Sequence, residues 1–329
     1  MSLRMSPLWW PVLAVASPVL LPVLFRKNRR FSRNLELAKR LNGQRIAEAG
    51  RLCLPEFAKI TLTVVVEHKA APGFISSPAV SYLLETDLGR VLFDAGYGPE
   101  DQAMAVNGKR LGLVEQPLDG VIISHLHPDH MGGFAAVKEN RLILAGEIAA
   151  RGDLPCYLPA EATVEEGVAE VVSRPRQLVA GLGTSGPLAR GLFLMGWVEE
   201  QAIVARLQGK GLVIITGCGH PSIEVIVEMV KKLSDDPIYA IIGGLHFPVT
   251  DSPLRRAGLK AQMIWGTGKP PWQRITDEDL TETIGYMRSL APKKLLLSGH
   301  DTCDHALGRF CDELTCETQV LEAGRRYEL

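Results

Sequence analysis

Two features of the sequence predict a mixed α/β fold with buried sheets. Short apolar runs, such as residues 121–123 and 212–215, contain no alternating polar positions, which is typical of strands buried on both faces. Between such runs lie segments with helical spacing. In residues 223–233, for example, apolar side chains recur every three or four positions and charged side chains occupy the opposite face.

The elements follow in a regular order. Strands are expected at residues 60–67, 80–85 and 90–93, with a turn at residues 87–89 between the last two. Further strands are expected near residues 121–124, 212–215, 240–242, 295–297 and 318–321. Thr276 and Asp279 have the spacing of a capping box and predict a helix start, and residues 304–314 predict the last helix. The first half is therefore rich in strands, and the second half alternates strands with helices.

Charge is distributed unevenly along the 329 residues. The formal net charge is −1, but residues 1–40 contain eight basic and one acidic residue. Residues 8–25 are uncharged, begin beside two tryptophans and end at a basic cluster, residues 26–33. This pattern predicts a membrane anchor within residues 1–50, with residues 51–329 forming one domain on the cytoplasmic side. A cleaved signal peptide and a segment docked on a soluble cytoplasmic protein are the alternatives.

Composition narrows the possible classes. With 46% hydrophobic and 22% charged residues, the chain is neither disordered nor fibrous. The six cysteines form no CxxC motif, which favours reduced thiols over a disulfide framework. The acidic body has no basic aromatic patch, so nucleic acid is not expected as a partner. The sequence does not indicate an oligomeric state.

Histidines follow several of the apolar runs. His125, His127, Asp129 and His130 lie within six residues after the run at 121–123. Three imidazoles and a carboxylate suit Zn²⁺, and also Fe or Mn. This cluster offers more ligands than one ion needs, so two neighbouring divalent ions are predicted. Three later runs also end at a histidine, namely His220, His246 and His300.

These motifs resemble those of the metallo-β-lactamase superfamily. The resemblance rests on the HxHxDH motif at residues 125–130 and on Asp94 after an apolar run, and it covers roughly residues 58–329. It implies an αββα sandwich with a dinuclear metal site at one edge of the two sheets. Residues 216–220 (Thr-Gly-Cys-Gly-His) and 242–246 (Ile-Gly-Gly-Leu-His) resemble a branch of metal-dependent hydrolases labelled 7,8-dihydropterin-6-methyl-4-(β-D-ribofuranosyl)aminobenzene-5′-phosphate synthase-like.

The resemblance also suggests roles for individual residues. The chain lacks the Pro-Gly-His-Thr loop of the wider superfamily, so His220 is expected to replace its histidine. Cys218 stands where a bridging Asp is usual, and either faces the metals or is a buried, inert thiol. His246 and His300 both qualify as the last ligand. Asp94 is expected to orient a ligand histidine rather than to bind metal.

This site predicts a hydrolase. Two ions would lower the pKa of water and polarise a carbonyl or phosphoryl oxygen, with Asp129 as both ligand and proton acceptor. The expected substrate is an ester, lactone, amide or phosphoester of a small or lipid-like molecule. A mononuclear iron oxygen or redox enzyme of the same fold and a non-catalytic metal-binding sensor are the alternatives.

Residues 247–274 form a long segment rich in proline and basic residues. It is predicted to be a lid-like insertion that binds an anionic group or rests on a membrane, with an ordinary packing insertion as the alternative. Its candidate substrate residues are Arg255, Arg256, Trp265 and Trp272.

Overall fold

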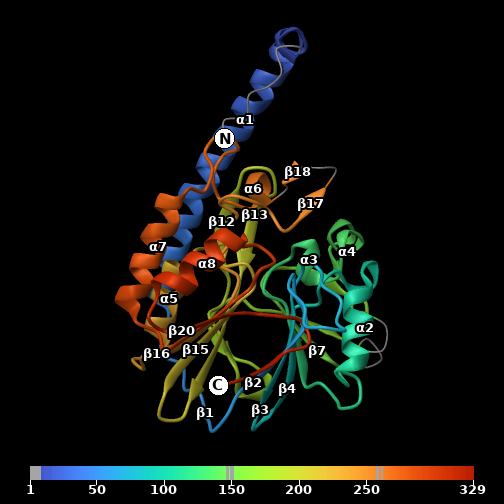
Figure 1. The fold of residues 1–329 in the computed structure, drawn as a ribbon, viewed down its shortest axis with the longest axis vertical. Coiled ribbons are helices and arrows are strands. Elements are labelled where there is room, and N and C mark those ends of the chain that lie inside the picture. The colour runs from blue at the N-terminus through green and yellow to red at the C-terminus, as the bar shows by residue number, and fades with distance from the viewer. Residues whose placement is uncertain (1–8, 146–147, 149–151, 257–258, 261) are drawn as a thin grey trace.

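The computed structural model describes residues 9–145, 148, 152–256, 259–260 and 262–329. The side chains of residues 9–13, 255–256, 259 and 264–265 lie outside the described part. Two β-sheets lie face to face, and helices cover the outer face of each sheet (Figure 1). This arrangement is an αββα sandwich, and the predicted fold class is confirmed.

The first sheet is built mainly from the N-terminal half. Its order is β21-β2-β3-β4-β5-β7-β9, and the pairs β4–β5, β5–β7 and β7–β9 are parallel. The strands are β2 (Thr61–Val66), β3 (Ser81–Thr86), β4 (Gly89–Phe93), β5 (Gly120–Ile122), β7 (Pro155–Leu158), β9 (Val168–Val171) and β21 (Arg326–Glu328).

The second sheet contains the later strands. Its order is β10-β11-β14-β15-β16-β19-β20, with β1 beside β14, and β15, β16, β19 and β20 run parallel. The strands are β1 (Glu56–Phe57), β10 (Arg176–Gln177), β11 (Gly183–Thr184), β14 (Ile203–Leu207), β15 (Gly211–Thr216), β16 (Ile238–Gly243), β19 (Lys294–Leu297) and β20 (Glu317–Val320). Short antiparallel or parallel pairs outside the two sheets are β12 (Leu188–Leu192) with β13 (Gly196–Glu200), β6 (Arg141–Leu142) with β8 (Thr163–Val164), and β17 (Arg255–Arg256) with β18 (Leu259–Lys260).

The helices fall into two outer layers (Figure 1). On the first sheet lie α2 (Gln102–Arg110), α3 (Pro128–Met131) and α4 (Phe134–Glu139), and on the second lie α5 (Ile223–Leu233), α7 (Asp277–Leu290) and α8 (Asp304–Glu313). The capping box predicted at Thr276 and Asp279 starts α7. In the part of the chain that the structure describes, the remaining short helices are α6 (Gln262–Trp265) and the 3-10 turns η1 (Gly98–Glu100) and η3 (Val179–Gly181).

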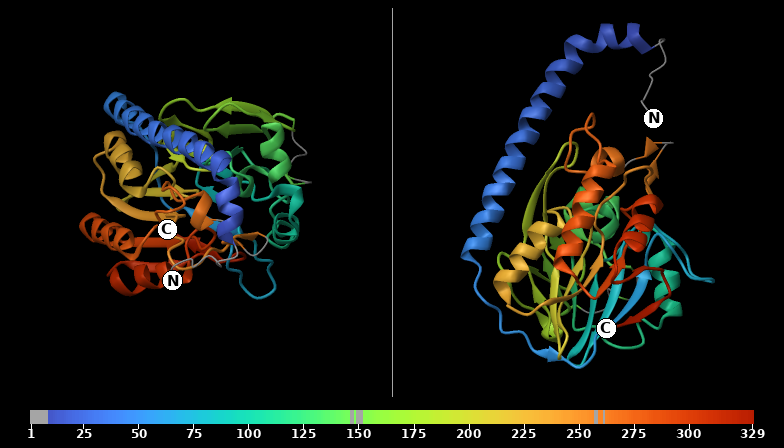
Figure 2. Two further views of the ribbon diagram at one scale, coloured as in Figure 1. Left: turned by 90° about the horizontal axis from the view of Figure 1, so that it is seen from above. Right: turned by 60° about the vertical axis from the view of Figure 1, so that its left-hand side comes forward.

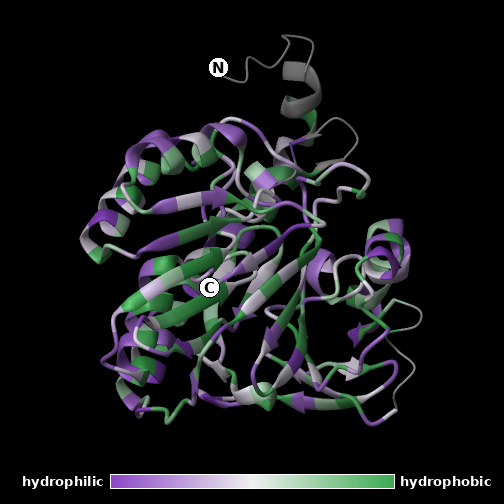
Figure 3. Cartoon of the chain, turned by 60° about the horizontal axis from the view of Figure 1, so that its bottom comes forward, coloured by the Kyte–Doolittle hydropathy of each residue, from purple (hydrophilic) through white to green (hydrophobic). Residues whose placement is uncertain are grey.

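Alternation along the strands divides the core into layers. In β15, Val213 and Ile215 belong to the cluster between the sheets, whereas Leu212 and Ile214 pack against the helices of the second sheet. Successive side chains of a strand point to opposite faces, so a strand with apolar residues at every position serves both layers. Figure 3 shows hydrophobic residues concentrated along the strands and a mixture along the helices.

The N-terminal segment forms one long helix, α1 (Trp9–Glu48), which extends beyond the sandwich (Figure 2). Its second half packs on β12. Asn42 exchanges two hydrogen bonds with the backbone of Ala189, at 2.9 and 2.7 Å, and Phe31 contacts Phe193 edge to face.

The prediction of a transmembrane anchor is wrong. Among the described residues, none of the helices combines the length and the apolarity needed to cross a bilayer. The apolar run at the start of α1 contains Pro18 and Pro22 and passes, within the same helix, into the basic cluster. The boundary proposed near residue 50 and the lid-like role of residues 247–274 stay predictions.

Candidate metal centre

The carboxyl ends of the parallel strands meet at one edge of the sandwich, near α3 and α6 (Figure 1). His125 follows β5, His220 follows β15, His246 follows β16 and His300 follows β19. Because adjacent parallel strands end at the same edge, these residues come together although they are far apart in the sequence.

Three imidazoles form what we call the histidine cluster. It contains His125, His127 and His220, each of which offers one ring nitrogen within 4.8 Å of the nitrogens offered by the other two. His127 Nδ1 and His220 Nε2 are 3.1 Å apart. Among the described residues, none hydrogen-bonds His125 Nε2 or His220 Nδ1, although both atoms are buried. Buried nitrogens without a partner are costly unless an ion or another group binds them.

A second group, the mixed cluster, contains Asp129, His130, Cys218 and His300, again within 4.8 Å. Cys218 Sγ lies 3.3 Å from His130 Nε2 and 3.2 Å from His300 Nε2. The same thiol also forms a group with His220 and His246, so it stands between the two clusters. Both ring nitrogens of His246 are buried and have no described hydrogen-bond partner. Cys218 therefore faces the site, and whether it binds metal stays a prediction.

Asp94 supports one histidine from each cluster. Its carboxylate accepts a hydrogen bond from His130 Nδ1 at 2.7 Å and from the Ser124 hydroxyl at 2.7 Å. Ser124 Oγ lies 2.9 Å from His125 Nδ1 and can accept its proton. With both Nδ1 atoms used in this way, His125 and His130 present Nε2 to the clusters. This is the position expected for a residue that orients ligand histidines.

The same arrangement recurs at His300 with different residues. Ser298 Oγ lies 2.5 Å from His300 Nδ1 and donates to Glu67 Oε2 at 2.5 Å. Glu67 also accepts from the Tyr82 hydroxyl at 3.0 Å. The acceptor chain keeps the proton of His300 on Nδ1 and leaves Nε2 facing the mixed cluster.

Glu200 fixes the loop that follows β15. Its carboxylate accepts hydrogen bonds from the backbone N–H groups of Gly217, Gly219 and His220, at 3.1, 2.8 and 2.8 Å. Three N–H donors on one buried carboxylate determine the path of residues 217–220, and hence the positions of Cys218 and His220.

Burial keeps most of the imidazoles neutral. It lowers the pKa of His127 and of His300 to about 4, and it lowers the pKa of His125 and of His220 well below the usual value, with neighbouring histidines adding to the effect. A neutral imidazole has the free lone pair that a metal ion requires.

The mixed cluster behaves differently because it contains acidic groups. Burial opposes a charge on His130, but Cys218, Asp129 and Asp94 outweigh this and raise the pKa of His130 above its usual value. Burial likewise opposes ionisation of Asp129, yet His130 holds the pKa of this carboxyl below its usual range. Burial raises the pKa of the Cys218 thiol. In this cluster the charged form of His130 therefore stabilises the charged form of Asp129, and the reverse also holds.

The site opens through a small pocket of about 80 Å³. Apart from the cluster residues, its lining includes the mainly apolar side chains of Tyr97, Phe134, Met195 and Leu254. Of the predicted substrate residues, Arg255 and Arg256 form β17, but their side chains and that of Trp265 lie outside the described part. Trp272 is 56% exposed and packs on Phe193, and it does not line this opening.

Three supporting residues were not identified from the sequence, namely Glu67, Glu200 and Ser298. Glu67 carried a usable signal, because it follows an apolar strand as Asp94 does. Ser298 carried the same signal, because it directly follows β19, whereas Glu200 lacked it, because it is the last residue of β13.

Comparison with known proteins agrees with this architecture. Residues 77–229 match the family model of the metallo-beta-lactamase superfamily. The chain carries a metallo-β-lactamase domain. This confirms the resemblance found in the sequence, and the described residues offer candidate metal sites of histidine, cysteine and aspartate.

Individual relatives of this metallo-β-lactamase domain extend the comparison. The 7,8-dihydropterin-6-methyl-4-(beta-D-ribofuranosyl)-aminobenzene-5'-phosphate synthase of Methanocaldococcus jannaschii is 26% identical over 292 residues, which cover 77% of this chain and 90% of the relative. The crystal structure of a metal-dependent hydrolase of the beta-lactamase superfamily superposes with a TM-score of 0.57 at 19% identity, covering 82% of this chain and 99% of that one. The similarity to this crystal structure shows that the two chains share a fold.

Proposed function

We propose that this metallo-β-lactamase domain is a metal-dependent hydrolase with two divalent ions, one in each cluster. The position of Cys218 carries the proposal. Its sulfur belongs to the mixed cluster and also forms a donor group with His246 and with His220, which is a member of the histidine cluster. A thiol that reaches one cluster and a histidine of the other suits a pair of neighbouring ions, and the nitrogen and sulfur atoms favour Zn²⁺.

The donor sets meet the chemical requirements of such ions. His125, His127 and His220 would hold the first ion, and Asp129, His130 and His300 the second, with Cys218 between them. His246 lies beside His220 and would complete either the metal site or the substrate site. When bound, divalent ions lower the pKa of water and polarise a carbonyl or phosphoryl oxygen.

The residues of the chain supply proton transfer and orientation. The Asp129 carboxylate remains ionised and lines the opening, so it can accept the proton of an attacking water. The hydroxyl group of this water adds to the acyl carbon or phosphorus of the substrate. The bond to the leaving group breaks, and the proton passes from Asp129 to the leaving group. Asp94, and Glu67 through Ser298, keep the ligand histidines in the tautomer that this geometry needs.

The opening suggests the class of substrate. A small pocket with Tyr97, Phe134, Met195 and Leu254 at its mouth would admit a small molecule with an apolar portion beside the scissile group. The archaeal relative is named as a synthase of a 5'-phosphate. We therefore include phosphoesters beside esters, lactones and amides, and we do not expect nucleic acid as a substrate.

The test combines metal analysis with turnover. The purified full-length chain should contain two Zn²⁺ ions and should hydrolyse at least one member of a panel of chromogenic esters, lactones, amides and phosphoesters. The H127A variant should lose this activity by about a hundredfold or more. One Fe per chain without hydrolysis would instead favour an oxygen or redox enzyme, and metal without any turnover would favour a sensor.

A further inference from the structure

A second cavity adjoins the metal centre on the side of α5 and α7. Its volume is about 470 Å³, which suits a small organic ligand. His220, His246 and Gly266 line both this cavity and the opening of the metal site. The two spaces are therefore neighbours, and one molecule could occupy both.

Arg190 lies in the wall of this cavity, on strand β12. Its Nε is buried and has no hydrogen-bond partner among the described residues, and none of the ion pairs among them includes the Arg190 guanidinium. Glu224 is close enough to act on the charge, but its Oε1 accepts a hydrogen bond from the Thr283 hydroxyl instead. Burial lowers the pKa of the guanidinium, which nonetheless remains a cation.

The backbone of residues 266–268 passes close to both Arg190 and the His246 ring of the metal site. A Cβ atom on Gly268 would lie 2.6 Å from Arg190 Nε, and one on Gly266 would collide with the His246 ring. The two glycines are only two residues apart. The guanidinium and the imidazole therefore lie within about 15 Å of each other, from the dimensions of an extended backbone. Only residues without a side chain allow the loop to approach both groups so closely.

The other cation that lines this cavity, Lys269, is already neutralised by an ion pair with Asp279 at 2.5 Å. A buried guanidinium without a carboxylate in ion-pair contact is unfavourable unless an anion binds it. Its parallel N–H groups match the oxygens of a phosphate or a carboxylate.

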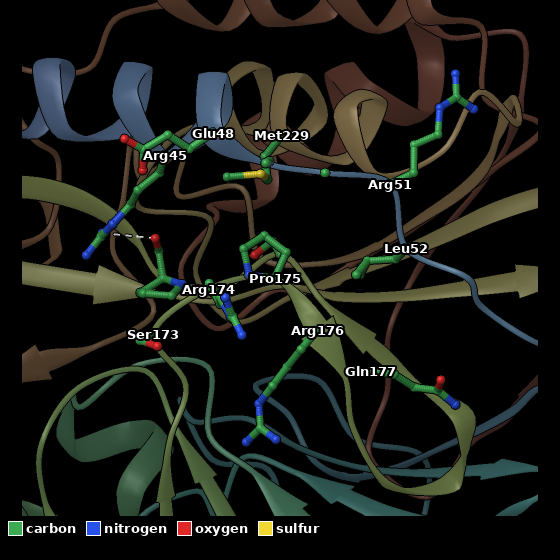
Figure 4. A pocket seen from close by; sticks show the side chains of 14 residues that line it. Arg45, Glu48, Arg51, Leu52, Ser173, Arg174, Pro175, Arg176, Gln177 and Met229 are labelled. Carbon is green, nitrogen blue, oxygen red and sulfur yellow. Dashed lines mark hydrogen bonds between the residues drawn. The ribbon is translucent and has the colours of Figure 1, made fainter.

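A more basic pocket elsewhere on the molecule lacks this arrangement. It measures about 530 Å³ and lies at the end of α1, where Figure 4 shows its arginine side chains pointing in different directions. Arg45 pairs with Glu199, Arg51 with Asp235 and Arg176 with Glu170. Arg174, in the same pocket, is exposed and provides a matched control.

We infer that Arg190 binds an anionic group, a phosphate or a carboxylate, at the end of the substrate remote from the bond that is cleaved. The inference rests on the proposed function, because it assumes that the substrate reaches from the metal centre into the adjoining cavity. On this inference the substrate carries an anionic group in addition to the bond that is cleaved, and Arg190 is a specificity-determining residue.

Anion binding can be measured without turnover. Inorganic phosphate and acetate are titrated by calorimetry into the metal-loaded full-length chain and into its R190Q, R190K and R174Q variants. We expect R190Q to weaken binding of the preferred anion by about tenfold or more, the loss of a charge-assisted hydrogen-bond pair. R190K should lose less, and R174Q should stay within twofold of the wild type. The anion that binds more tightly identifies the group as phosphate or carboxylate.

Two outcomes would overturn the inference. One is that R190Q binds both anions as tightly as the wild type. The other is that H127A abolishes anion binding while R190Q does not, because the metal ions alone would then hold the anion. If R190Q melts at a lower temperature than the wild type, R190K serves as the folded reference, and a folded R190K that binds the anion no better than R190Q contradicts the inference.

Turnover then separates this inference from the proposed function. For substrates with a terminal anionic group, R190Q should raise KM more than it lowers kcat, relative to the same substrates without that group. A wild-type chain that binds phosphate through Arg190 but hydrolyses nothing would contradict the hydrolase and leave the anion site standing.

Discussion

The histidine cluster and the mixed cluster differ in charge and in what supports them. The histidine cluster consists of imidazoles that burial keeps neutral, and its members His127 and His220 contact each other directly. The mixed cluster contains acidic groups, and the carboxylates of Asp94 and Glu67 stand behind its histidines. From this difference we expect the mixed cluster to contribute more than the histidine cluster to the stability of the metal-free fold.

The largest expected contrast is between H130A and H127A. Removal of His130 leaves the buried Asp94 carboxylate without its cationic partner, and we expect the metal-free protein to lose about 3–5 kcal/mol of unfolding free energy. His127 is partly exposed and has no carboxylate behind it, so H127A should cost about 1 kcal/mol or less. Denaturant unfolding of the metal-free variants measures both values, and equal losses would contradict the comparison.

D94N tests the support of the mixed cluster without removing a ligand. The amide is a weaker acceptor for His130 Nδ1–H and Ser124 Oγ–H, so the orientation of His130 is less well fixed. Loss of such a supporting group typically weakens metal binding by about 10–100-fold. Competition with a coloured chelator measures the affinity of each ion. The ion in the mixed cluster should be weakened more, because Asp94 bonds His130 directly and reaches His125 only through Ser124. An unchanged affinity for both ions would refute the role given to Asp94.

A smaller effect is expected for the hydrogen-bond chain behind His300. S298A removes the link between Glu67 and His300 and should weaken one metal site by about tenfold. Y82F is the matched control, because it removes another hydrogen bond to Glu67 and leaves the link to His300 intact. The chelator competition should therefore distinguish S298A from Y82F. Equal affinities in the two variants would show that Glu67 acts only on packing.

A further effect is a dependence of stability on pH. Burial raises the pKa of Glu67 to about 7 from 4.5, so the folded metal-free protein favours the protonated carboxyl. Its contribution is complete below pH 4.5 and is lost as the pH rises through 7. Since E67Q cannot titrate, the melting temperature of the wild type should exceed that of E67Q by more at pH 5 than at pH 8. A difference that widens toward pH 8 would reverse the assigned sign.

Much of the fold and of the site could be predicted because strand ends are visible in the sequence. An apolar run followed by His125, Asp94 or His300 identifies both a buried strand and the edge where its polar residue must lie. Parallel pairing then places these edges together. The sequence could not show that Glu67 and Ser298 meet, since they are 231 residues apart and follow strands of different sheets. Nor could it show that Arg190 is unpaired, which depends on every residue around it.

The misinterpretation of the N-terminal segment has a physical reason. An apolar run between tryptophans and basic residues resembles a membrane span when only composition is considered. In the structure the same residues begin a long helix whose second half is held by side chains such as Asn42 and Phe31. The contacts that dock this half lie beyond the apolar run, so the run alone could not predict them.

The central claim is that the two clusters each hold one metal ion. Metal content per chain, measured by mass spectrometry on the wild type, H127A and H300A, tests it most directly. We expect two ions in the wild type and one in each variant, because each substitution removes a ligand from a different cluster. A single ion in the wild type, or the loss of both ions in both variants, would contradict two separate sites.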